Sequence, residues 1–250
     1  MLKLVSVLYP DVADNPTINP SIKEVHVSQP ASSMTVPSTS ASSALVPIRS
    51  MGASHSESIA AHLLALDPAD RYLRFGYAAN DEQILRYVNG LDFERDEIFG
   101  IYNRRLELIA MAHLAFSTDP QLHSCAEFGV SVMAHARGRR YGTRLFERAV
   151  MHARNEGVDI MFIHALSENT AMLNITRKAG ALIKRDGSES DAYLVLPPAD
   201  LDSQVTEIVE EHIAQTDYRF KLRAKQFLEW LAIVQEVRQN IRDAREHSAM

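Results

Sequence analysis

The pattern of apolar and polar positions first becomes regular after His55, where one helical face carries few charged residues. That face comprises Ile59, His62, Leu63 and Leu66. Asp67-Pro68 predicts the end of this helix, because proline lacks a backbone N–H and disfavours helical geometry in the residue before it.

A second short helix is predicted after Asn80, with Ile84, Leu85 and Val88 on its apolar face. Between the two helices, residues 70–75 alternate charged and bulky side chains. This alternation matches neither a helix nor a strand, so we expect a packed connection there.

Strand patterns follow in close succession. They cover Glu97 to Tyr102, Leu106 to Phe116 and Cys125 to Val132. Short polar turns separate these runs, which is typical of an antiparallel meander.

After Gly142 the pattern predicts a helix, a strand, a second helix and two strands. They span Gly142 to a C-cap at Gly157, Ile160 to Leu166, Asn169 to Ala179, Leu182 to Arg185, and Ala192 to Leu196. Side chains 145, 146, 149 and 150 form the apolar side of the first helix, and Gly180 ends the second. The element order predicts an α/β (α+β) fold with a mixed, mostly antiparallel sheet flanked by helices.

Composition divides the chain into three parts. Residues 1–53 are rich in proline and serine and are predicted to be a flexible leader, either inert or a docking segment. Residues 54–197 form the predicted domain, and 198–250 a helical extension. The extension carries a heptad-like stripe at Phe220, Ala224, Phe227, Leu231, Val234 and Ile241. That stripe is compatible with packing on the chain's own domain and with a homodimer.

Charge and cysteine usage narrow the function classes. The net charge of −6 argues against a general nucleic-acid or membrane binder, so an anion site must be local. Cys125 is the single cysteine, and no export signal or membrane span is recognised, which favours the reducing cytoplasm. The histidines show no zinc-helix spacing, and His113 and His164 have no nearby carboxylate in the sequence, so no metal site is predicted.

A phosphate-binding loop is predicted where the strand ending at Val132 leads into the helix that opens at Thr143. Backbone N–H groups at a helix N-terminus bind anions, and glycine lets the backbone approach a ligand closely. The loop consists of Arg137, Gly138, Arg139, Arg140, Tyr141 and Gly142, followed by Arg144. Its arginines concentrate positive charge in an otherwise acidic chain.

This loop resembles the acyl-CoA loop of the GNAT superfamily of acetyltransferases. The family pattern, [Arg/Gln]-x-x-Gly-x-[Gly/Ala] after a Val-x-Val-like strand end, is matched by Arg137 and Gly142 and by the run Val130, Ser131 and Val132. A later element, an asparagine ahead of a helix that ends in glycine, is matched by Asn169 and Gly180. Residues 70–75 and Met172 show a weaker similarity to bacterial protein-lysine acetyltransferases.

Two positions depart from the family pattern. Arg140 stands where the loop has its first glycine, and a positive φ at this position would cost about 1 to 2 kcal/mol. Thr176 occupies the place of the tyrosine that protonates the leaving thiolate in many relatives. The general acid is therefore unassigned.

Glu127 is the candidate general base. Strand alternation places it with Gly129 and Ser131, on a face that we expect to be roomy. Its position also resembles that of a catalytic glutamate in some members of the superfamily. Cys125 shares this face and is a rival as nucleophile, although a lone strand cysteine is more often a buried small hydrophobe.

The resemblance implies an N-acetyltransferase that moves an acetyl group from acetyl-CoA to a primary amine by direct attack. The acceptor would be a small metabolite or a protein lysine, and no metal is implied. The alternative is a module that binds acyl-CoA as a sensor without turnover.

Overall fold

The computed structural model describes residues 46–118 and 124–200, together with 203, 204, 206, 207, 209–218 and 222. All labelled elements belong to the unit that begins at Pro47. None of the helices within these ranges has both the length and the apolar character needed to cross a membrane.

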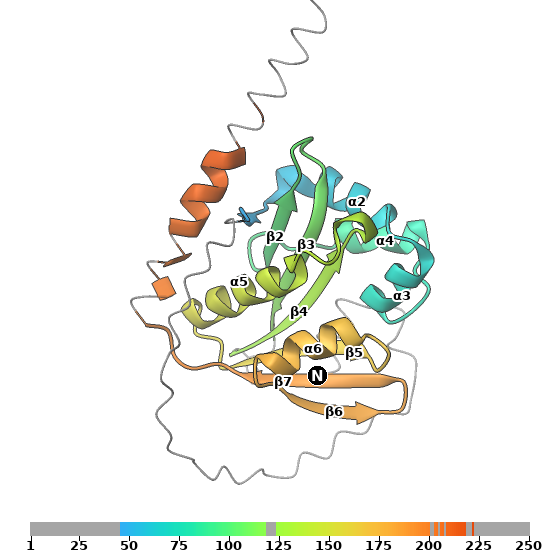
Figure 1. Ribbon diagram of the computed structural model, residues 1–250, viewed down its shortest axis with the longest axis vertical. Coiled ribbons are helices and arrows are strands. Elements are labelled where there is room, and N and C mark those ends of the chain that lie inside the picture. The colour runs from blue at the N-terminus through green and yellow to red at the C-terminus, as the bar shows by residue number, and fades with distance from the viewer. Residues whose placement is uncertain are drawn as a thin grey trace, which may run out of the picture. The chain divides into compact units, whose positions relative to one another are not determined.

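Within the described ranges, seven strands form one sheet with the order β1-β2-β3-β4-β5-β7-β6 (Figure 1). They are β1 (Arg49–Ser50), β2 (Glu97–Tyr102), β3 (Leu108–Phe116), β4 (Cys125–Val132), β5 (Ile160–Leu166), β6 (Leu182–Asp186) and β7 (Glu189–Val195). Every neighbouring pair is antiparallel except β4 and β5, which are parallel. The predicted meander and the mixed, mostly antiparallel sheet are confirmed.

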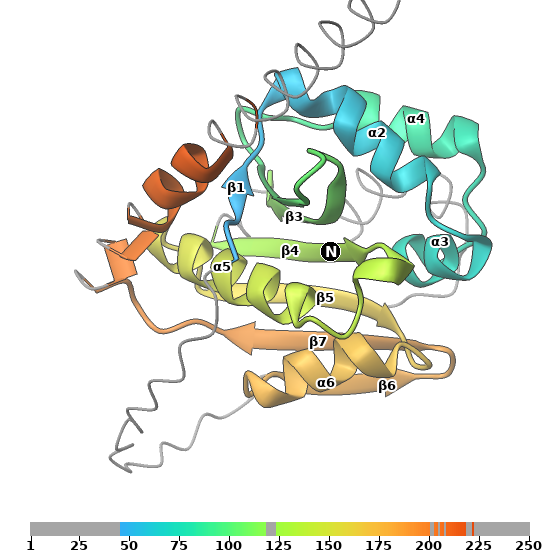
Figure 2. The same ribbon diagram turned by 45° about the horizontal axis from the view of Figure 1, so that its top comes forward.

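Helices cover both faces of this sheet (Figures 1 and 2). They are α2 (Ser56–Leu64), α3 (Pro68–Phe75), α4 (Asp81–Asn89), α5 (Tyr141–Asn155) and α6 (Thr170–Lys178), with 3-10 turns η2 (Ala53–His55) and η3 (Ala134–Ala136). The first three helices lie against the face of β3 and β4 that carries Gly129, and α5 and α6 lie on the opposite face.

The prediction that residues 70–75 lack regular structure is wrong, because they belong to α3. The Asp67 side chain accepts a hydrogen bond from the Asp70 backbone N–H at 2.8 Å, and Pro68 occupies the first turn. Gly76 ends the helix with a φ of 80°. These start and stop signals bound a helix in which only Phe75 is buried.

A few other details differ from the pattern. Leu85 is 43% exposed, whereas Ile84 and Val88 are buried as predicted. The third strand begins at Leu108 because Leu106 turns the chain with a φ of 62°. The last strand begins at Glu189, since its polar first residues pair with both neighbouring strands.

The core between α5 and the sheet matches the predicted apolar face. Leu145, Phe146 and Ala149 are buried, and the Phe146 ring meets that of Phe128 edge-on at a centroid distance of 5.2 Å. Burying such side chains contributes roughly 1.5 to 3 kcal/mol each. The helix that follows the predicted phosphate loop is therefore anchored to β4, the strand that precedes the loop.

Both predicted domain borders are crossed by contacts. The strand β1 pairs with β2, so the sheet includes residues from the segment 1–53. On the other side, Arg148 is 3% exposed and pairs with Glu207 at 2.8 Å and Glu211 at 3.6 Å. The start of the extension thus packs on α5, while the stripe from Phe220 to Ile241 lies outside the described residues and its role in a homodimer stays a prediction.

The Glu207 carboxylate also contacts His152 at 2.6 Å, and this pair defines a pH window. Burial opposes the ionisation of Glu207, but hydrogen bonds from His152 and Asn155 outweigh it and lower its pKa from 4.5 to about 2. Burial likewise lowers the pKa of His152, but its bond to Glu207 raises it above 6.5 overall. Glu207 therefore stabilises the fold above pH 4.5 and loses this effect as pH falls toward 2. His152 stabilises it below pH 6.5 and loses this effect as pH rises through its folded pKa.

Glu207→Gln is expected to lower the melting temperature most between pH 4.5 and 6.5, where both partners carry their charges. Above the folded pKa of His152 the loss should be smaller, because His152 is then neutral and contributes less to the pair. Circular dichroism melts within this window and at higher pH test the expectation, with Glu210→Gln in the same helical segment as the control. An equal loss of melting temperature within the window and above it would contradict the expectation.

Arg140 begins α5 in the left-handed conformation, with φ 63° and ψ 18°. A residue with a side chain is strained there, whereas glycine adopts this geometry freely at some cost in unfolded-state entropy. Arg140→Gly is therefore expected to raise the free energy of unfolding by about 0.5 to 1 kcal/mol in urea titrations. Arg139→Gly is the control and should be neutral or destabilising, since Arg139 has no positive φ.

Candidate functional site

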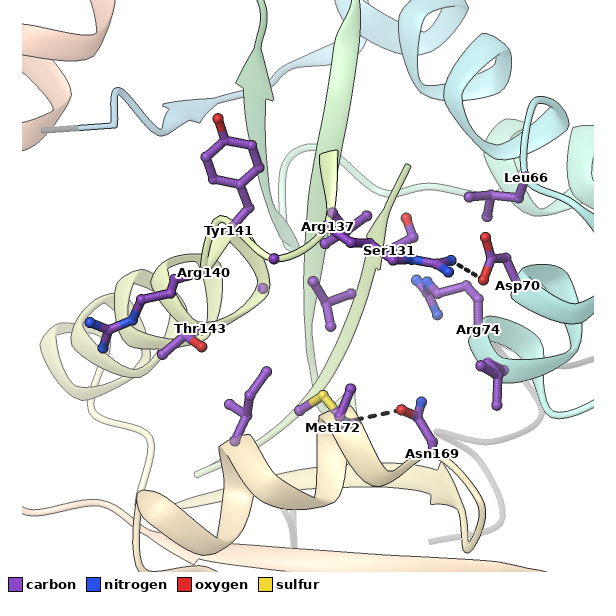
Figure 3. Close-up of a pocket in the computed structure, with 17 residues that line it drawn as sticks. Leu66, Asp70, Arg74, Ser131, Arg137, Arg140, Tyr141, Thr143, Asn169 and Met172 are labelled. Carbon is purple, nitrogen blue, oxygen red and sulfur yellow. Dashed lines mark hydrogen bonds and ion pairs between the residues drawn. The ribbon is translucent and has the colours of Figure 1, made fainter. Parts of the chain in front are cut away.

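The strands β4 and β5 separate halfway along their length. They pair from Cys125↔Ile160 to Glu127↔Phe162, after which β4 continues to Val132 paired with β3 alone. Beyond Glu127, the β5-facing edge of β4 therefore has no strand partner within the described ranges. A cavity of about 490 Å³ lies at this opening (Figure 3). It is lined by the end of β4, the loop before α5, the start of α6, helix α3 and the turn that precedes α3.

The structure brings most of the predicted ligand-binding residues together in this cavity. Its lining includes Val130, Ser131, Val132, Arg137, Gly138, Arg140, Tyr141, Gly142, Thr143 and Asn169. Of the predicted set, Arg139 and Glu127 do not line it. The strand end, the loop and Asn169 thus form one site.

The loop before α5 has the geometry of an anion site. Gly138 turns the chain with a φ of 75°, and Arg140 follows with its positive φ. The first turn of α5 has no side-chain cap and no acidic residue. Its leading N–H groups, at Tyr141, Gly142 and Thr143, precede the first helical bond, which runs from the Arg144 N–H to the Arg140 carbonyl. Such N–H groups and the helix dipole favour a bound anion.

Helix α3 supplies a wall of the cavity that the sequence pattern did not predict. Asp70, Leu73 and Arg74 line it, and Asp70 forms an ion pair with Arg137 of the loop (Figure 3). The sequence signal for this helix was present in Pro68 at its start and Gly76 at its end. Helical spacing then groups Asp70 with Leu73 and Arg74.

Two predicted binding residues also have structural roles. The Asn169 side chain caps α6 by accepting a hydrogen bond from the Met172 N–H at 3.1 Å. The Ser131 hydroxyl lies 2.8 Å from Nε2 of His62, whose Nδ1 is 2.9 Å from the Leu108 carbonyl. Burial lowers the pKa of His62 to about 4, so this histidine is neutral and holds α2 on the sheet.

Glu127 lies at the last paired position of β4 and β5. Its side chain is 8% exposed, and within the described ranges its carboxylate has no hydrogen bond or ion pair. Burial raises the pKa of Glu127, and the charges of His164 and Arg74 partly oppose this rise. A desolvated carboxylate of this kind is a suitable proton acceptor when its pKa moves toward neutrality.

The face around Glu127 is not roomy, contrary to the prediction. A Cβ at Gly129 would lie 2.6 to 2.9 Å from three atoms of the Arg74 guanidinium. Arg74 therefore occupies the space above Gly129, between Glu127 and Ser131 on the same strand. A side chain at position 129 would displace this guanidinium from the strand.

The prediction that His113 and His164 lack carboxylates is wrong, because strand pairing supplies them. His113 lies 3.0 Å from Asp96, and His164 lies 2.7 Å from Asp191 on the neighbouring strand β7. In the described part of the chain, no group of three His, Cys, Asp or Glu side chains could hold a metal ion. These histidines belong to ion pairs and hydrogen-bond networks.

The rival nucleophile and the residue at the position of the family's general acid are both buried away from the cavity. Cys125 is 4% exposed at the far end of β4, and burial raises the pKa of its thiol, which disfavours a nucleophilic thiolate. Thr176 is fully buried, and its hydroxyl donates to the Leu173 carbonyl at 3.1 Å. Neither residue lines the cavity.

Comparison with known proteins places part of the chain in a protein family. The GNAT acetyltransferase family model matches residues 60–181, which include α3, the loop and α6. No curated protein matches the sequence significantly.

Solved structures share the fold at low sequence identity. The GNAT domain of PAT from S. lividans is 19% identical, with a TM-score of 0.51 over 60% of this chain and 89% of that one. A protein from Acinetobacter baylyi ADP1 assigned as an acetyltransferase is 16% identical, with a TM-score of 0.51 over 61% of this chain and 93% of that one. The family model thus identifies residues 60–181 as an acetyltransferase domain of the GNAT family, which supports an acyltransferase activity for the chain.

Proposed function

We propose that this chain is an N-acetyltransferase that moves the acetyl group of acetyl-CoA to a primary amine by direct attack. The observation that carries the proposal is the single cavity in which the anion-binding loop meets the open edge of β4. The acceptor is an amine of a small metabolite or of a protein lysine. The free Cys125 thiol is compatible with action in the reducing cytoplasm.

The loop supports binding of the CoA diphosphate. N–H groups at the start of α5 would donate to the phosphate oxygens, and the Arg137 and Arg140 side chains add positive charge. The unpaired edge of β4 offers backbone donors and acceptors to the amide groups of the pantetheine arm. The thioester would then lie near Val130 to Val132, where a backbone N–H polarises its carbonyl.

In the reaction, the amine nitrogen forms a bond to the thioester carbon, the C–S bond breaks, and the thiolate leaves and takes a proton from water. Glu127 accepts the proton that the amine loses and then gives it up to the hydroxide that this water leaves, so that no net proton is gained or lost. Because Arg74 fills the space above Gly129 and Glu127 does not line the cavity, a bridging water suits this transfer better than direct contact. Thr176 is buried and is not available as the acid.

The alternative, an acyl-CoA sensor without turnover, is favoured by the position of Glu127 outside the cavity wall and by the absence of an acid at Thr176. Thiol release from acetyl-CoA over a panel of amines separates the two functions. Saturable CoA binding without release for any amine would support the sensor.

Glu127→Gln is expected to lower kcat/KM for thiol release by about 100-fold or more, which is the contribution of a general base. Calorimetry should find CoA affinity within about twofold of the parent, because the cavity wall is unchanged. Glu57→Gln, an exposed change in α2, is the control and should keep full activity. Normal turnover by Glu127→Gln would remove this residue from the mechanism.

Gly142→Ala is expected to weaken CoA binding by about tenfold through a clash with the diphosphate. The protein itself tolerates the methyl group, since the new Cβ would meet Ile175 at 3.5 Å and Val132 at 3.8 Å, both ordinary contacts. Thermal stability should therefore be retained while the calorimetric Kd rises. Gly52→Ala, which places a methyl group in open space, is the control, and equal affinities would argue against a phosphate at this loop.

A further inference from the structure

A chain of hydrogen bonds leads through the face of the sheet opposite α5 and ends at Arg74. Nη2 of Arg74 donates to the Tyr87 hydroxyl at 2.9 Å, and this hydroxyl lies 2.7 Å from Nδ1 of His113. Nε2 of His113 lies 3.0 Å from the Asp96 carboxylate, which also accepts from Arg95 at 2.8 Å. The chain connects α3, α4 and β3.

The proton positions in this chain follow from its donors. A guanidinium can only donate, so the Tyr87 oxygen accepts from Arg74 and its own proton is free to go to Nδ1 of His113. The remaining His113 proton then sits on Nε2 and is donated to Asp96. Every link is satisfied when His113 is neutral, which agrees with burial lowering its pKa. A protonated His113 would instead donate to the Tyr87 oxygen, and the tyrosine proton would then have no acceptor in this series of bonds.

The chain is rigid because most of it is buried. His113 is 3% exposed and Asp96 is 7% exposed. Asp96 is fixed at its other oxygen by the Phe116 backbone N–H at 3.3 Å. The Tyr87 ring packs edge-on against Phe75 at a centroid distance of 5.4 Å. Such a chain holds its last member, Arg74, in one place.

The place where Arg74 is held lies beside Glu127. Three atoms of its guanidinium are within 2.6 to 2.9 Å of where a Cβ at Gly129 would be. Glu127 and Gly129 are two residues apart on β4, so their side-chain positions share one face. Figure 3 shows Arg74 extending from α3 toward the strand that carries Ser131.

We propose that Tyr87 and His113 are positioning residues that hold the Arg74 guanidinium over Gly129, where its positive charge favours the anionic form of the buried Glu127 carboxylate. The effect on catalysis rests on the proposed role of Glu127 as the base. The positioning itself does not, and it is measurable without turnover.

The charges that face Glu127 come from three elements. Arg74 of α3 and His164 of β5 favour the carboxylate anion, and Asp191 of β7 opposes it. His164 makes the larger of the two cationic contributions, but it is paired with Asp191 at 2.7 Å, and Asp191 acts on Glu127 in the opposite sense. Arg74 is the cation whose charge is permanent across the working pH range, so its removal is the cleaner test.

The test compares Arg74→Gln, Arg74→Lys and Tyr87→Phe with the parent. Removing the cation destabilises the Glu127 anion, so the acidic limb of the kcat/KM profile should move to higher pH in Arg74→Gln. Rates on that limb should fall about threefold or more, while the high-pH plateau changes less. Arg74→Lys should restore most of the limb. Tyr87→Phe should shift the acidic limb in the same direction as Arg74→Gln. Its CoA affinity should stay within about twofold of the parent, because Tyr87 does not line the cavity.

A direct titration of Glu127 by carboxyl carbon NMR, assigned from the signal missing in Glu127→Gln, provides the readout without turnover. An upward shift of its midpoint in Arg74→Gln and Tyr87→Phe supports the positioning role. Tyr72→Phe on the exposed side of α3 is the control and should leave it in place. An unchanged midpoint in a folded Arg74→Gln protein overturns the inference. A shifted midpoint with an unshifted rate profile supports the positioning and counts instead against Glu127 as the base.

Discussion

The separation of β4 from β5 beyond Glu127 is the constraint on which the rest of the site depends. Up to this residue, the two strands satisfy each other's backbone groups, and beyond it they do not. Unpaired backbone groups need partners, and a ligand with its own amides can supply them. The opening also separates the starts of α5 and α6, so that both helix N-termini face one cavity.

Charge is distributed in this site according to what each part contacts. The loop at α5 concentrates arginines near solvent, where they can meet a polyanion without a large desolvation cost. Glu127 lies at the other end in a buried setting, where its ionisation depends on nearby cations. Helix α3 links the two ends through Asp70, which contacts Arg137, and through Arg74, which lies above Gly129. A short helix with one buried residue thus has more influence on the site than on the core.

The sequence predicted most of the sheet and the anion-binding loop because both depend on local patterns. Strands 97–102, 125–132 and 160–166 have the predicted bounds, since alternation and buried runs reflect the faces of one sheet. The loop residues were identifiable because glycine, arginine and a strand-to-helix change occur within a dozen positions. Helix α3 was missed because its alternation of charged and bulky residues was not interpreted as a helical face, although Asp67 and Gly76 cap both of its ends.

By itself, the sequence determined the order of the elements from β2 to β7, the fold class and the family resemblance, since these follow from periodicity and from motifs that are close together in the chain. Tertiary structure decided which side chains surround the candidate base. Asp96 meets His113, Asp191 meets His164, and Arg74 meets Gly129, across separations of 17, 27 and 55 residues. The physical reason is that burial and charge pairing depend on register between strands and on the approach of helices, which no local pattern encodes.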